Sequence, residues 1–562
     1  MIIILYEDKF MENIKRLIDA SSGKEELDLV LKGGNVVDVF TGRIVKADIA
    51  VKSGYICGVG NYDGKNSIDV TGKYIIPGLI DSHLHIESSM VTPPEYSRIT
   101  LPHGVTTAIA DPHEIANVCG EYGLEFMKDS AKYAPMDILF MLPSCVPAAD
   151  FEHSGASFDS ADTKRLAENF FGIGEMMNYP AICGGDEEIL AKLCKEHIDG
   201  HAPLLTGQPL DAYVSAGIKT DHECSRADEL LEKVSKGMYI ALREGTLSKD
   251  IEKLFKGINP YTLRRCMFCT DDRFIGEIKN DGSIDNSIRN AVTLGINPID
   301  AIIMATLNPA ECYGLKDKGA IAPSYRADIV VADSLELNNI LAVYKDGVLC
   351  AENGAEACVN RPTAIYAKGV TETVHLDGIT ADTFKCDIPD TLTAIELIPH
   401  AIITKKVTAK NTDKLSKLCV LERHHNLGTK GFGFVTNYGI TNGAIASSVG
   451  HDSHNIAVIG DNDDDMALAV NTLGHDGGIA VCSNGKVLSF LRLGIGGLMS
   501  QDCAEEVITA HDDLYEAAKQ LSISEEIDPF LALAFLPLPV IPEIRVTDSG
   551  LFDVTQFKFI DM

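Results

Sequence analysis

The sequence is poor in basic residues. Its 562 residues include 49 Lys plus Arg against 81 Asp plus Glu, which gives a formal net charge of −32 at pH 7. A surface that follows a phosphate backbone needs an excess of positive charge, and a strongly negative field repels polyanions and anionic membranes. We therefore expect neither a nucleic acid nor a membrane among the partners of this protein.

Long apolar runs, targeting segments and regularly spaced cysteines are also missing. The first ten residues, MIIILYEDKF, join a short apolar run to acidic residues and lack the basic flank of a signal peptide. The most apolar later stretch, residues 530–542, contains three prolines and is too short to cross a bilayer. Fifteen cysteines, an odd number without regular spacing, indicate a reducing compartment. These features predict a soluble, cytoplasmic protein.

Short strand-like runs dominate the first half of the chain. Residues 28–75 alternate apolar runs with glycine and asparagine turns, which is typical of hairpins in a small β unit. From residue 75 onward, eight apolar runs are separated by stretches long enough for a helix. The runs end near His83, Asp111, Pro143, Glu175, His201, His222, Arg243 and Asp271. One strand, one loop and one helix per step predict an α/β fold, a TIM-like (β/α)8 barrel.

Metal-ligand side chains lie at the C-terminal ends of these predicted strands, where barrel enzymes build their active sites. His83 and His85 are two residues apart on a strand, so their imidazoles point to the same face and can bind one ion. Four imidazoles and two carboxylates are enough for two divalent metals that share a bridging carboxylate and keep positions open for water. The predicted metal ligands are His83, His85, Glu175, His201, His222 and Asp271.

The segments that carry these residues resemble those of a known family. IIPGLIDSHLH and ATLNPAECYGLKDKGAIAPSYRADIVVAD are similar to the amidohydrolase superfamily of metal-dependent hydrolases, in which a small β-sandwich built from both sides of the barrel flanks it. Within this superfamily, the chain most resembles the adenine deaminase family, because it contains segments similar to that family's motifs. In chain order, these segments are DSHLHIESSM, GVTTAIADPHEIANV, GEMMNYP, DGHAP, TDHE, REGT, CTDDR, GAIASSVGHDSHNI and GIGGLMS. Many relatives carry a carboxylated lysine at the fourth strand, where this chain has Glu175.

The resemblance implies an activity, a cofactor and a domain organisation. The activity is hydrolytic deamination of free adenine to hypoxanthine and ammonia, in purine salvage, at a binuclear Mn²⁺ or Fe²⁺ site. The domains are an N-terminal extension (1–27), a composite β-sandwich (28–75 and 318–372), the catalytic barrel (76–317) and a C-terminal adenine deaminase-type domain (373–562). In the last domain, TFKCDIP, TAIELIP and AIITKKV are predicted strands.

Deamination of a purine gives the predicted ligands their roles. Water becomes a strong enough nucleophile when metals lower its pKa toward 7, so the two histidine pairs would share it, with Glu175 as the bridge. Asp271, at the end of the eighth run, is placed to take the proton and pass it to the leaving ammonia. We therefore predict that Asp271 and Glu175 are the catalytic residues.

Attack at the 6-carbon also needs a donor to the neighbouring ring nitrogen. Four candidate substrate-binding residues remain open, namely His113, Glu114, Glu244 and Asp272. By analogy with a deaminase relative, the second Asp of a DD pair contacts substrate, which favours Asp272. Arg243 and Glu244 could instead form an ion pair that closes the barrel end.

Several alternatives stay open on the sequence alone. His451, Asp452 and His454 in HDSHN could hold a further metal, cap the active-site mouth, or form a polar turn satisfied by backbone groups. The alternative activity is another amidohydrolase reaction on a cyclic amide or an aminated heterocycle. A purine-binding protein on a decayed barrel would lack at least one ligand, and none is missing here. The choice between a monomer and a homodimer also stays open.

Overall fold

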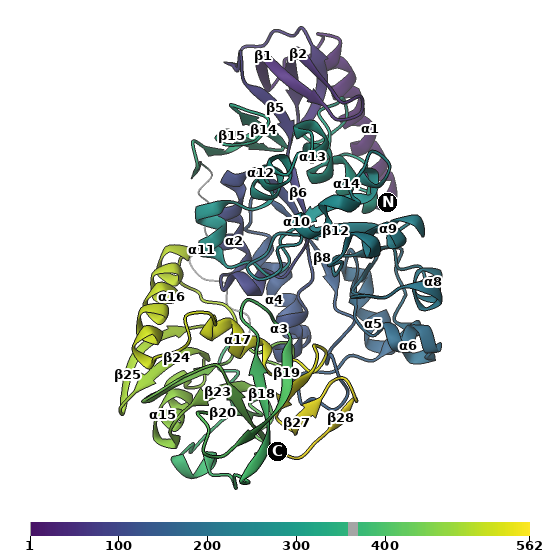
Figure 1. Cartoon of the computed structure of the whole chain (residues 1–562). Coiled ribbons are helices and arrows are strands. Elements are labelled where there is room, and N and C mark those ends of the chain that lie inside the picture. Colours follow the sequence, from purple (N-terminus) through teal and green to yellow (C-terminus); the bar gives the residue numbers. More distant parts are fainter. Residues whose placement is uncertain (1, 358–368) are drawn as a thin grey trace.

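A computed structural model describes residues 2–357 and 369–562 of the chain, and for residues 2–11 the backbone alone. Figure 1 shows three parts, with a β-sheet at the top, an α/β barrel in the centre and a second β-rich domain below. The upper sheet contains strands from both sides of the barrel, so the chain leaves this sheet, forms the barrel and returns. The fold class predicted from the strand spacing is confirmed.

The barrel strands form a five-stranded sheet of order β10-β9-β8-β7-β6 and a three-stranded sheet of order β11-β12-β13, all parallel. Nearly every residue in them is buried, because helices cover the outer face and side chains fill the interior. The predicted run ends fall within two residues of the observed strand ends. The strands are β6 (Leu79–Leu84), β7 (Val105–Ala110), β8 (Asp137–Leu142), β9 (Gly172–Met176), β10 (Ile198–Gly200), β11 (Thr220–Asp221), β12 (Tyr239–Arg243) and β13 (Cys266–Cys269).

Helices cover the barrel (Figure 1). Local sequence sets their ends: Asn297 caps the helix that starts at Pro298, because its side chain accepts a hydrogen bond from the Ile299 N–H at 2.9 Å. None of the helices in the described ranges is long and apolar enough to cross a membrane. The helices of this part are α2 (Pro93–Thr100), α3 (His113–Cys119), α4 (Glu121–Ala131), α5 (Ser160–Leu166), α6 (Tyr179–Gly184), α7 (Glu187–Ala191), α8 (Gly207–Ser215), α9 (Ala227–Ser235), α10 (Ile251–Leu254), α11 (Ile275–Asp281), α12 (Ile284–Thr293), α13 (Pro298–Ala305) and α14 (Leu307–Cys312).

The upper sheet has the order β17-β16-β15-β14-β5-β1-β2-β3, and β4 pairs with β1. Its two halves meet where β14 runs antiparallel to β5, so the segments before and after the barrel share one sheet. The N-terminal helix α1 (Ile2–Ser21) packs against β2 and β3. The strands are β1 (Leu29–Asp38), β2 (Arg43–Lys52), β3 (Tyr55–Gly60), β4 (Ser67–Asp69), β5 (Tyr74–Pro77), β14 (Ile329–Ala332), β15 (Ile340–Lys345), β16 (Val348–Glu352) and β17 (Ala355–Glu356).

The C-terminal domain is built on an eight-stranded sheet of order β19-β18-β21-β20-β23-β22-β24-β25, with a small sheet β26-β27-β28. Its strands are β18 (Thr391–Leu397), β19 (Thr404–Lys410), β20 (Ser416–Leu421), β21 (Lys430–Thr436), β22 (Gly443–Ser447), β23 (Ile456–Gly460), β24 (Gly478–Ser483), β25 (Lys486–Arg492), β26 (Ile544–Thr547), β27 (Gly550–Asp553) and β28 (Lys558–Phe559). Its helices are α15 (Asp463–Leu473), α16 (Ala504–Ala518) and α17 (Pro529–Phe535).

One predicted strand of this domain is wrong. The TFKCDIP segment begins inside a 3-10 helix over Ala381–Phe384, whereas TAIELIP and AIITKKV overlap β18 and β19. The Thr380 N–H donates to Thr383 Oγ1 at 3.2 Å, which stabilises a turn at this point instead of an extended chain.

The C-terminal domain lies against the mouth of the barrel. The Ser500 N–H donates to the Met90 carbonyl at 2.9 Å. Glu505 of α16 pairs with Arg98 of α2 at 2.5 Å and with Lys279 of α11 at 3.0 Å. Contacts of this kind fix the domain over the strand ends that carry the predicted ligands.

The sheets that form the barrel meet at two seams, and main-chain bonds close the seam between β13 and β6. The Asp271 N–H donates to the His83 carbonyl at 3.0 Å, and the His85 N–H donates to the Asp271 carbonyl at 3.2 Å. Three predicted ligands therefore close the barrel with their own backbone, which fixes their positions relative to one another.

Side chains close the other seam, between the short strands β10 and β11. The Gly200 N–H donates to Thr220 Oγ1 at 3.0 Å, and the Ala202 N–H donates to Asp221 Oδ1 at 2.8 Å. Lys233 of α9 is fully buried beside this seam and donates to the Ala202 carbonyl at 2.6 Å and to Asp221 Oδ2 at 2.8 Å. Ala202 and Asp221 flank the predicted ligands, so Lys233 supports both strand ends.

Lys233→Met should lower the free energy of unfolding by about 3–5 kcal/mol, because it leaves two buried carboxylates, Asp221 and Glu229, without their cation. Urea denaturation followed by circular dichroism measures the change. Lys236→Met is a matched control on the same helix, since it removes a partly exposed pair with Asp211 and should cost less than about 1 kcal/mol. Equal effects of the two substitutions would contradict the assigned role of Lys233.

Candidate active site

The six predicted ligands converge at the C-terminal end of the barrel. Their candidate ligand atoms fall into three-residue groups whose atoms all lie within 4.8 Å of one another. Such short separations are what a metal ion needs from its ligands. The groups are His83, His85 and Glu175; Glu175, His201 and His222; and His83, His222 and Asp271.

The hydrogen bond of His85 fixes which of its nitrogens faces the site. Its Nδ1 lies 2.9 Å from the carbonyl oxygen of Asp111, and because a carbonyl only accepts, Nδ1 carries the hydrogen. Nε2 is then the nitrogen with a free lone pair. It lies 3.0 Å from Glu175 Oε1 and 3.3 Å from Asp271 Oδ1, in the position of a metal-binding atom.

Glu175 divides its two carboxylate oxygens between two histidine pairs. Oε1 lies 3.0 Å from His85 Nε2 and 3.5 Å from His83 Nε2. Oε2 lies 2.6 Å from His201 Nδ1 and 3.4 Å from His222 Nε2. One oxygen facing each pair is the arrangement that a carboxylate bridging two cations requires.

Asp271 also uses its two oxygens differently. Its backbone has φ 56°, a left-handed conformation that is uncommon for a residue other than glycine and often occurs at functional sites. Oδ1 faces His85, and Oδ2 accepts a hydrogen bond from Arg243 at 3.3 Å. Burial raises the pKa of Asp271, but His85 and Arg243 outweigh burial and hold this pKa well below its usual value.

Arg243 forms ion pairs with Asp271 and with two further carboxylates. Besides Asp271, it pairs with Asp250 at 2.9 Å and with Glu223. Three carboxylates around one buried guanidinium satisfy its donors and fix its geometry. One Glu223 carboxylate oxygen in turn lies 3.9 Å from His201 Nδ1. Arg243 and Glu223 therefore connect Asp271 with His201 within the ligand group.

Glu244 is the one substrate-binding candidate that the structure places away from the ligands. Neighbouring residues of a strand point to opposite faces, so Glu244 at the end of β12 faces away from the side that Arg243 occupies. Its carboxylate lies among Arg273, Lys249 and Asn290, and burial raises its pKa. The ion pairs of Arg243 are with Glu223, Asp250 and Asp271 instead of Glu244, and substrate binding by Glu244 stays a prediction.

The site concentrates buried charge. Burial alone lowers the pKa of His83, but the carboxylates of Asp199 and Glu175 outweigh it and raise this pKa to about 10. Burial raises the pKa of Glu175, yet His222 and His201 hold it well below its usual value. A proton on His83 thus compensates these carboxylates, and bound cations would replace such a proton. His83 Nε2 is buried without a hydrogen-bond partner, so this set of residues fits a metal pair.

His113 and Glu114, at the start of α3, lie beside the ligand group. His113 Nδ1 is 3.4 Å from Glu175 Oε1, and its Nε2 is 3.4 Å from Glu114 Oε1. Both side chains are buried. His113 therefore contacts the predicted ligand Glu175 directly, and Glu114 lies next to His113.

Asp272, the favoured substrate contact, lies at the inner end of a cavity. Ser88 Oγ donates a hydrogen bond to its Oδ1. Burial and the neighbouring charge of Asp271 raise its pKa. A raised pKa favours the protonated carboxyl, and in that form the group can donate to a ring nitrogen, which is the chemistry predicted for this residue.

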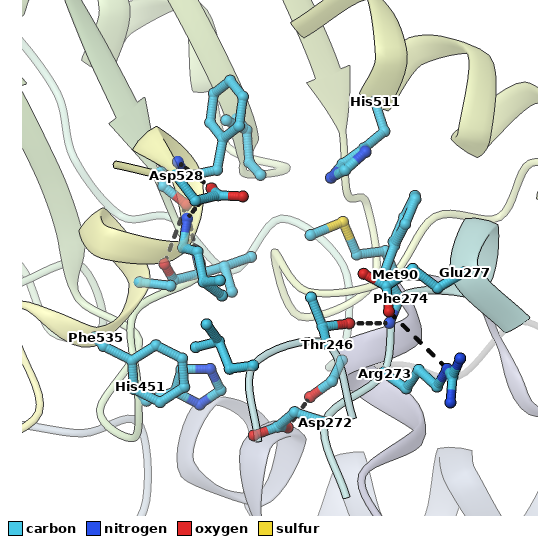
Figure 2. A pocket seen from close by; sticks show the side chains of 18 of the residues that line it. Met90, Thr246, Asp272, Arg273, Phe274, Glu277, His451, His511, Asp528 and Phe535 are labelled. Atoms are coloured by element: carbon cyan, nitrogen blue, oxygen red, sulfur yellow. Dashed lines mark hydrogen bonds and ion pairs between the residues drawn. The ribbon is translucent and has the colours of Figure 1, made fainter. Parts of the chain in front are cut away.

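The cavity, of about 150 Å³, lies between the barrel and the C-terminal domain. Figure 2 shows Asp272 and His451 at one end, and His511 and Asp528 at the other. Most of the remaining wall is apolar and aromatic, which suits a flat ring with a few polar contacts. This part of the wall includes Met90, Phe274, Val449, Tyr515, Phe530 and Phe535.

The sequence left the role of the HDSHN segment of the C-terminal domain open, and the structure connects this segment to the site. His451 Nδ1 lies 2.5 Å from Glu114 Oε1, and His454 Nε2 contacts Glu114 Oε2. The HDSHN turn therefore caps the mouth of the barrel, which is one of the three alternatives that the sequence left open. In the sequence, only the two histidines of this segment pointed to a role at the site. Their neighbours in the chain do not reveal that the partner is Glu114, which lies 337 residues away from His451.

Comparisons with known proteins show which families the chain is similar to. The sequence model of the Amidohydrolase family matches residues 74–350, and that of the Adenine deaminase C-terminal domain matches residues 391–558. The chain is 43% identical to an adenine deaminase of Clostridium acetobutylicum, over 97% of this chain and 100% of that protein. It is also 43% identical to an adenine deaminase of Nitratidesulfovibrio vulgaris strain Hildenborough, over 97% and 98% of the two chains. A β-aspartyl dipeptidase structure from Fervidobacterium islandicum AW-1 is 18% identical, with a TM-score of 0.45 over 59% of this chain and 99% of that one.

Gly174→Ala should displace Glu175. A Cβ at Gly174 would lie 2.1 Å from Asp111 Oδ2, the oxygen that accepts the Glu175 N–H at 2.8 Å. We expect the variant to lose bound metal and about 1–3 kcal/mol of unfolding free energy, as measured by metal analysis and denaturation. Gly184→Ala, at a glycine with no atom within 4 Å of its added Cβ, is the control and should change neither quantity appreciably. Full metal content in Gly174→Ala would refute this account.

Proposed function

The chain belongs to the adenine deaminase family of amidohydrolases, and we propose that it hydrolyses free adenine to hypoxanthine and ammonia. The division of the Glu175 oxygens between two histidine pairs carries this proposal. Two divalent cations, Mn²⁺ or Fe²⁺, would be held by His83 and His85 on one side and by His201 and His222 on the other. When bound, such ions act as Lewis acids that lower the pKa of water toward 7.

The chain supplies the proton transfers. Oδ1 of Asp271 faces the histidine side of the site and is positioned to take a proton from the attacking water and return it to the leaving amino group. Arg243, which donates to Oδ2, and the β13–β6 seam hold the Asp271 carboxylate so that Oδ1 keeps this direction. Asp272, at the inner end of the cavity, would donate to a ring nitrogen, so the ring does not accumulate negative charge during attack.

We propose a cytoplasmic setting for this reaction. Each described cysteine is a free thiol, which supports a reducing cytoplasm, and the reaction itself supports a place in purine salvage. We also propose the predicted domains as the structural units, which the division of the strands between the upper sheet and the barrel supports. We propose neither a nucleic acid nor a membrane partner, because the net charge is −32.

Two alternatives can be distinguished from this proposal. Another amidohydrolase reaction on an aminated ring would use the same metals and differ only in the lining of the cavity. A purine-binding protein on a decayed barrel would need a lost ligand, and all six predicted ligands are present and close together. Ammonia release from adenine, guanine and cytosine by Mn²⁺-loaded or Fe²⁺-loaded protein tests all three functions.

Free adenine should be preferred over adenosine by about 10²-fold or more in kcat/KM, because a cavity of about 150 Å³ closed by the C-terminal domain leaves little room for a ribose. Steady-state ammonia release from both compounds measures the ratio. Comparable values for the base and the nucleoside would favour the alternative amidohydrolase reaction.

Asp271→Asn and Glu175→Gln should separate proton transfer from metal holding. The amide at position 271 keeps one oxygen but accepts no proton, so metal content should fall little while turnover drops by about 10²-fold or more. An amide at position 175 offers only one oxygen and no charge, so at least one metal should be released. Metal stoichiometry and single-turnover ammonia release are measured for both variants. The opposite pattern would mean that the two roles have been exchanged.

A further inference from the structure

A turn of the C-terminal domain holds Glu114 with two imidazoles. His451 Nδ1 lies 2.5 Å from one carboxylate oxygen, and His454 Nε2 contacts the other. All three side chains are buried. Glu114 therefore has both oxygens occupied by donors from another domain, so it is a positioning residue for those imidazoles and is not available as a free acid at the substrate.

The two histidines differ in what their second nitrogen does. His454 Nδ1 accepts a hydrogen bond from the Gly450 N–H at 3.2 Å, so this nitrogen carries no hydrogen and Nε2 is the donor to Glu114. Both nitrogens of His454 are thus used inside the protein, and only 1% of its side chain is exposed. His454 has no free nitrogen for a ligand.

His451 has a free edge, and this edge lies at the cavity. Its Nδ1 donates to Glu114, since a carboxylate only accepts, which leaves Nε2 at the other side of the ring. The ring stacks on Phe535 at 4.5 Å between centroids, and 10% of the side chain is exposed. Figure 2 shows His451 beside Phe535 at the end of the cavity that Asp272 also lines.

We propose that His451 is a base-binding residue, which Glu114 and Phe535 hold in place so that Nε2–H donates to a ring nitrogen of adenine. The inference rests on the proposed function and adds a contact from the C-terminal domain. Adenine presents in-plane ring nitrogens on more than one edge, so Asp272 and His451 can contact the same ring from two domains. The cavity lies between these two side chains, as this contact requires.

The local charges agree with a donor at this position. Burial lowers the pKa of His451, but the carboxylate of Glu114 outweighs it and raises this pKa to about 9. Burial lowers the pKa of His454 to about 4, despite the same carboxylate. His451 then carries hydrogens on both nitrogens at neutral pH, while His454 stays neutral. Glu114, His451 and His454 together are close to neutral in charge, which suits their burial.

His451→Gln and His454→Gln form a matched pair for the test. Each removes one imidazole from Glu114, but only His451 also lines the cavity within the described part of the chain. Metal-loaded wild type and variants are assayed for adenine turnover. They are also assayed for inhibition by three deazaadenines, which lack N1, N3 or N7. Metal stoichiometry and thermal unfolding confirm that each preparation is folded.

In the wild type, two of the three deazaadenines should bind about tenfold more weakly than the third, because one lacks the nitrogen that Asp272 contacts and the other lacks the nitrogen that His451 contacts. His451→Gln should raise KM for adenine about tenfold or more and abolish the discrimination against one of these two analogues, while the discrimination due to Asp272 remains and metal content is unchanged. His454→Gln should keep the discrimination, whatever its effect on turnover. If His451→Gln unfolds, Phe535→Leu removes the ring that orients His451 and should weaken the same discrimination.

The outcomes separate the inference from the proposed function. A wild-type enzyme that releases no ammonia from adenine overturns the proposed function. A wild-type enzyme that does so, together with unchanged discrimination in His451→Gln, overturns only the role of His451. Equal effects of His451→Gln and His454→Gln on discrimination would reduce both residues to supports for Glu114.

Discussion

The buried carboxylate of Glu175 is the group around which the site is arranged. A negative charge removed from water is stable only when positive or donor groups surround it, and here four imidazoles from other strand ends do so. This condition requires β6, β9, β10 and β11 to end at one place with the right faces inward. The parallel barrel meets it, because the C-terminal ends of its strands all lie at the same rim.

The ligands are held by a layer of contacts behind them. Asp111 serves two of them, since its carbonyl accepts from His85 and its carboxylate accepts from the Glu175 N–H. Lys233 supports the two strand ends that precede His201 and His222, where main-chain pairing between β10 and β11 is replaced by side chains. Such outer contacts orient ligands and account for the fixed geometry of a site with many buried charges.

The C-terminal domain forms one side of the candidate active site. It supplies one side of the cavity, the histidines on Glu114 and the ion pairs of Glu505 that bind it to the barrel. Pockets between domains are common binding sites, because two rigid surfaces can present polar groups to opposite edges of one ligand. A purine placed here would be enclosed by both domains, which joins substrate choice to the docking of the C-terminal domain.

The sequence by itself determined the barrel, because eight apolar runs at regular spacing report the period of strand and helix directly. It also predicted the ligand types, because polar residues at the ends of buried strands have few alternative roles. It failed locally at residues 381–384, where side-chain capping favours a 3-10 turn over a strand. These successes and this failure all depend on neighbours in the chain.

Tertiary structure alone decided how the side chains divide the work. It set which Glu175 oxygen faces which histidine pair and directed the Glu244 side chain away from the ligands. It also brought Arg243 into ion pairs with Asp271, Asp250 and Glu223. It also joined His451 to Glu114 across 337 residues. The physical reason is the same in each case. A hydrogen bond depends on tenths of an ångström and on ring orientation, and these are set only when separately folded parts pack together.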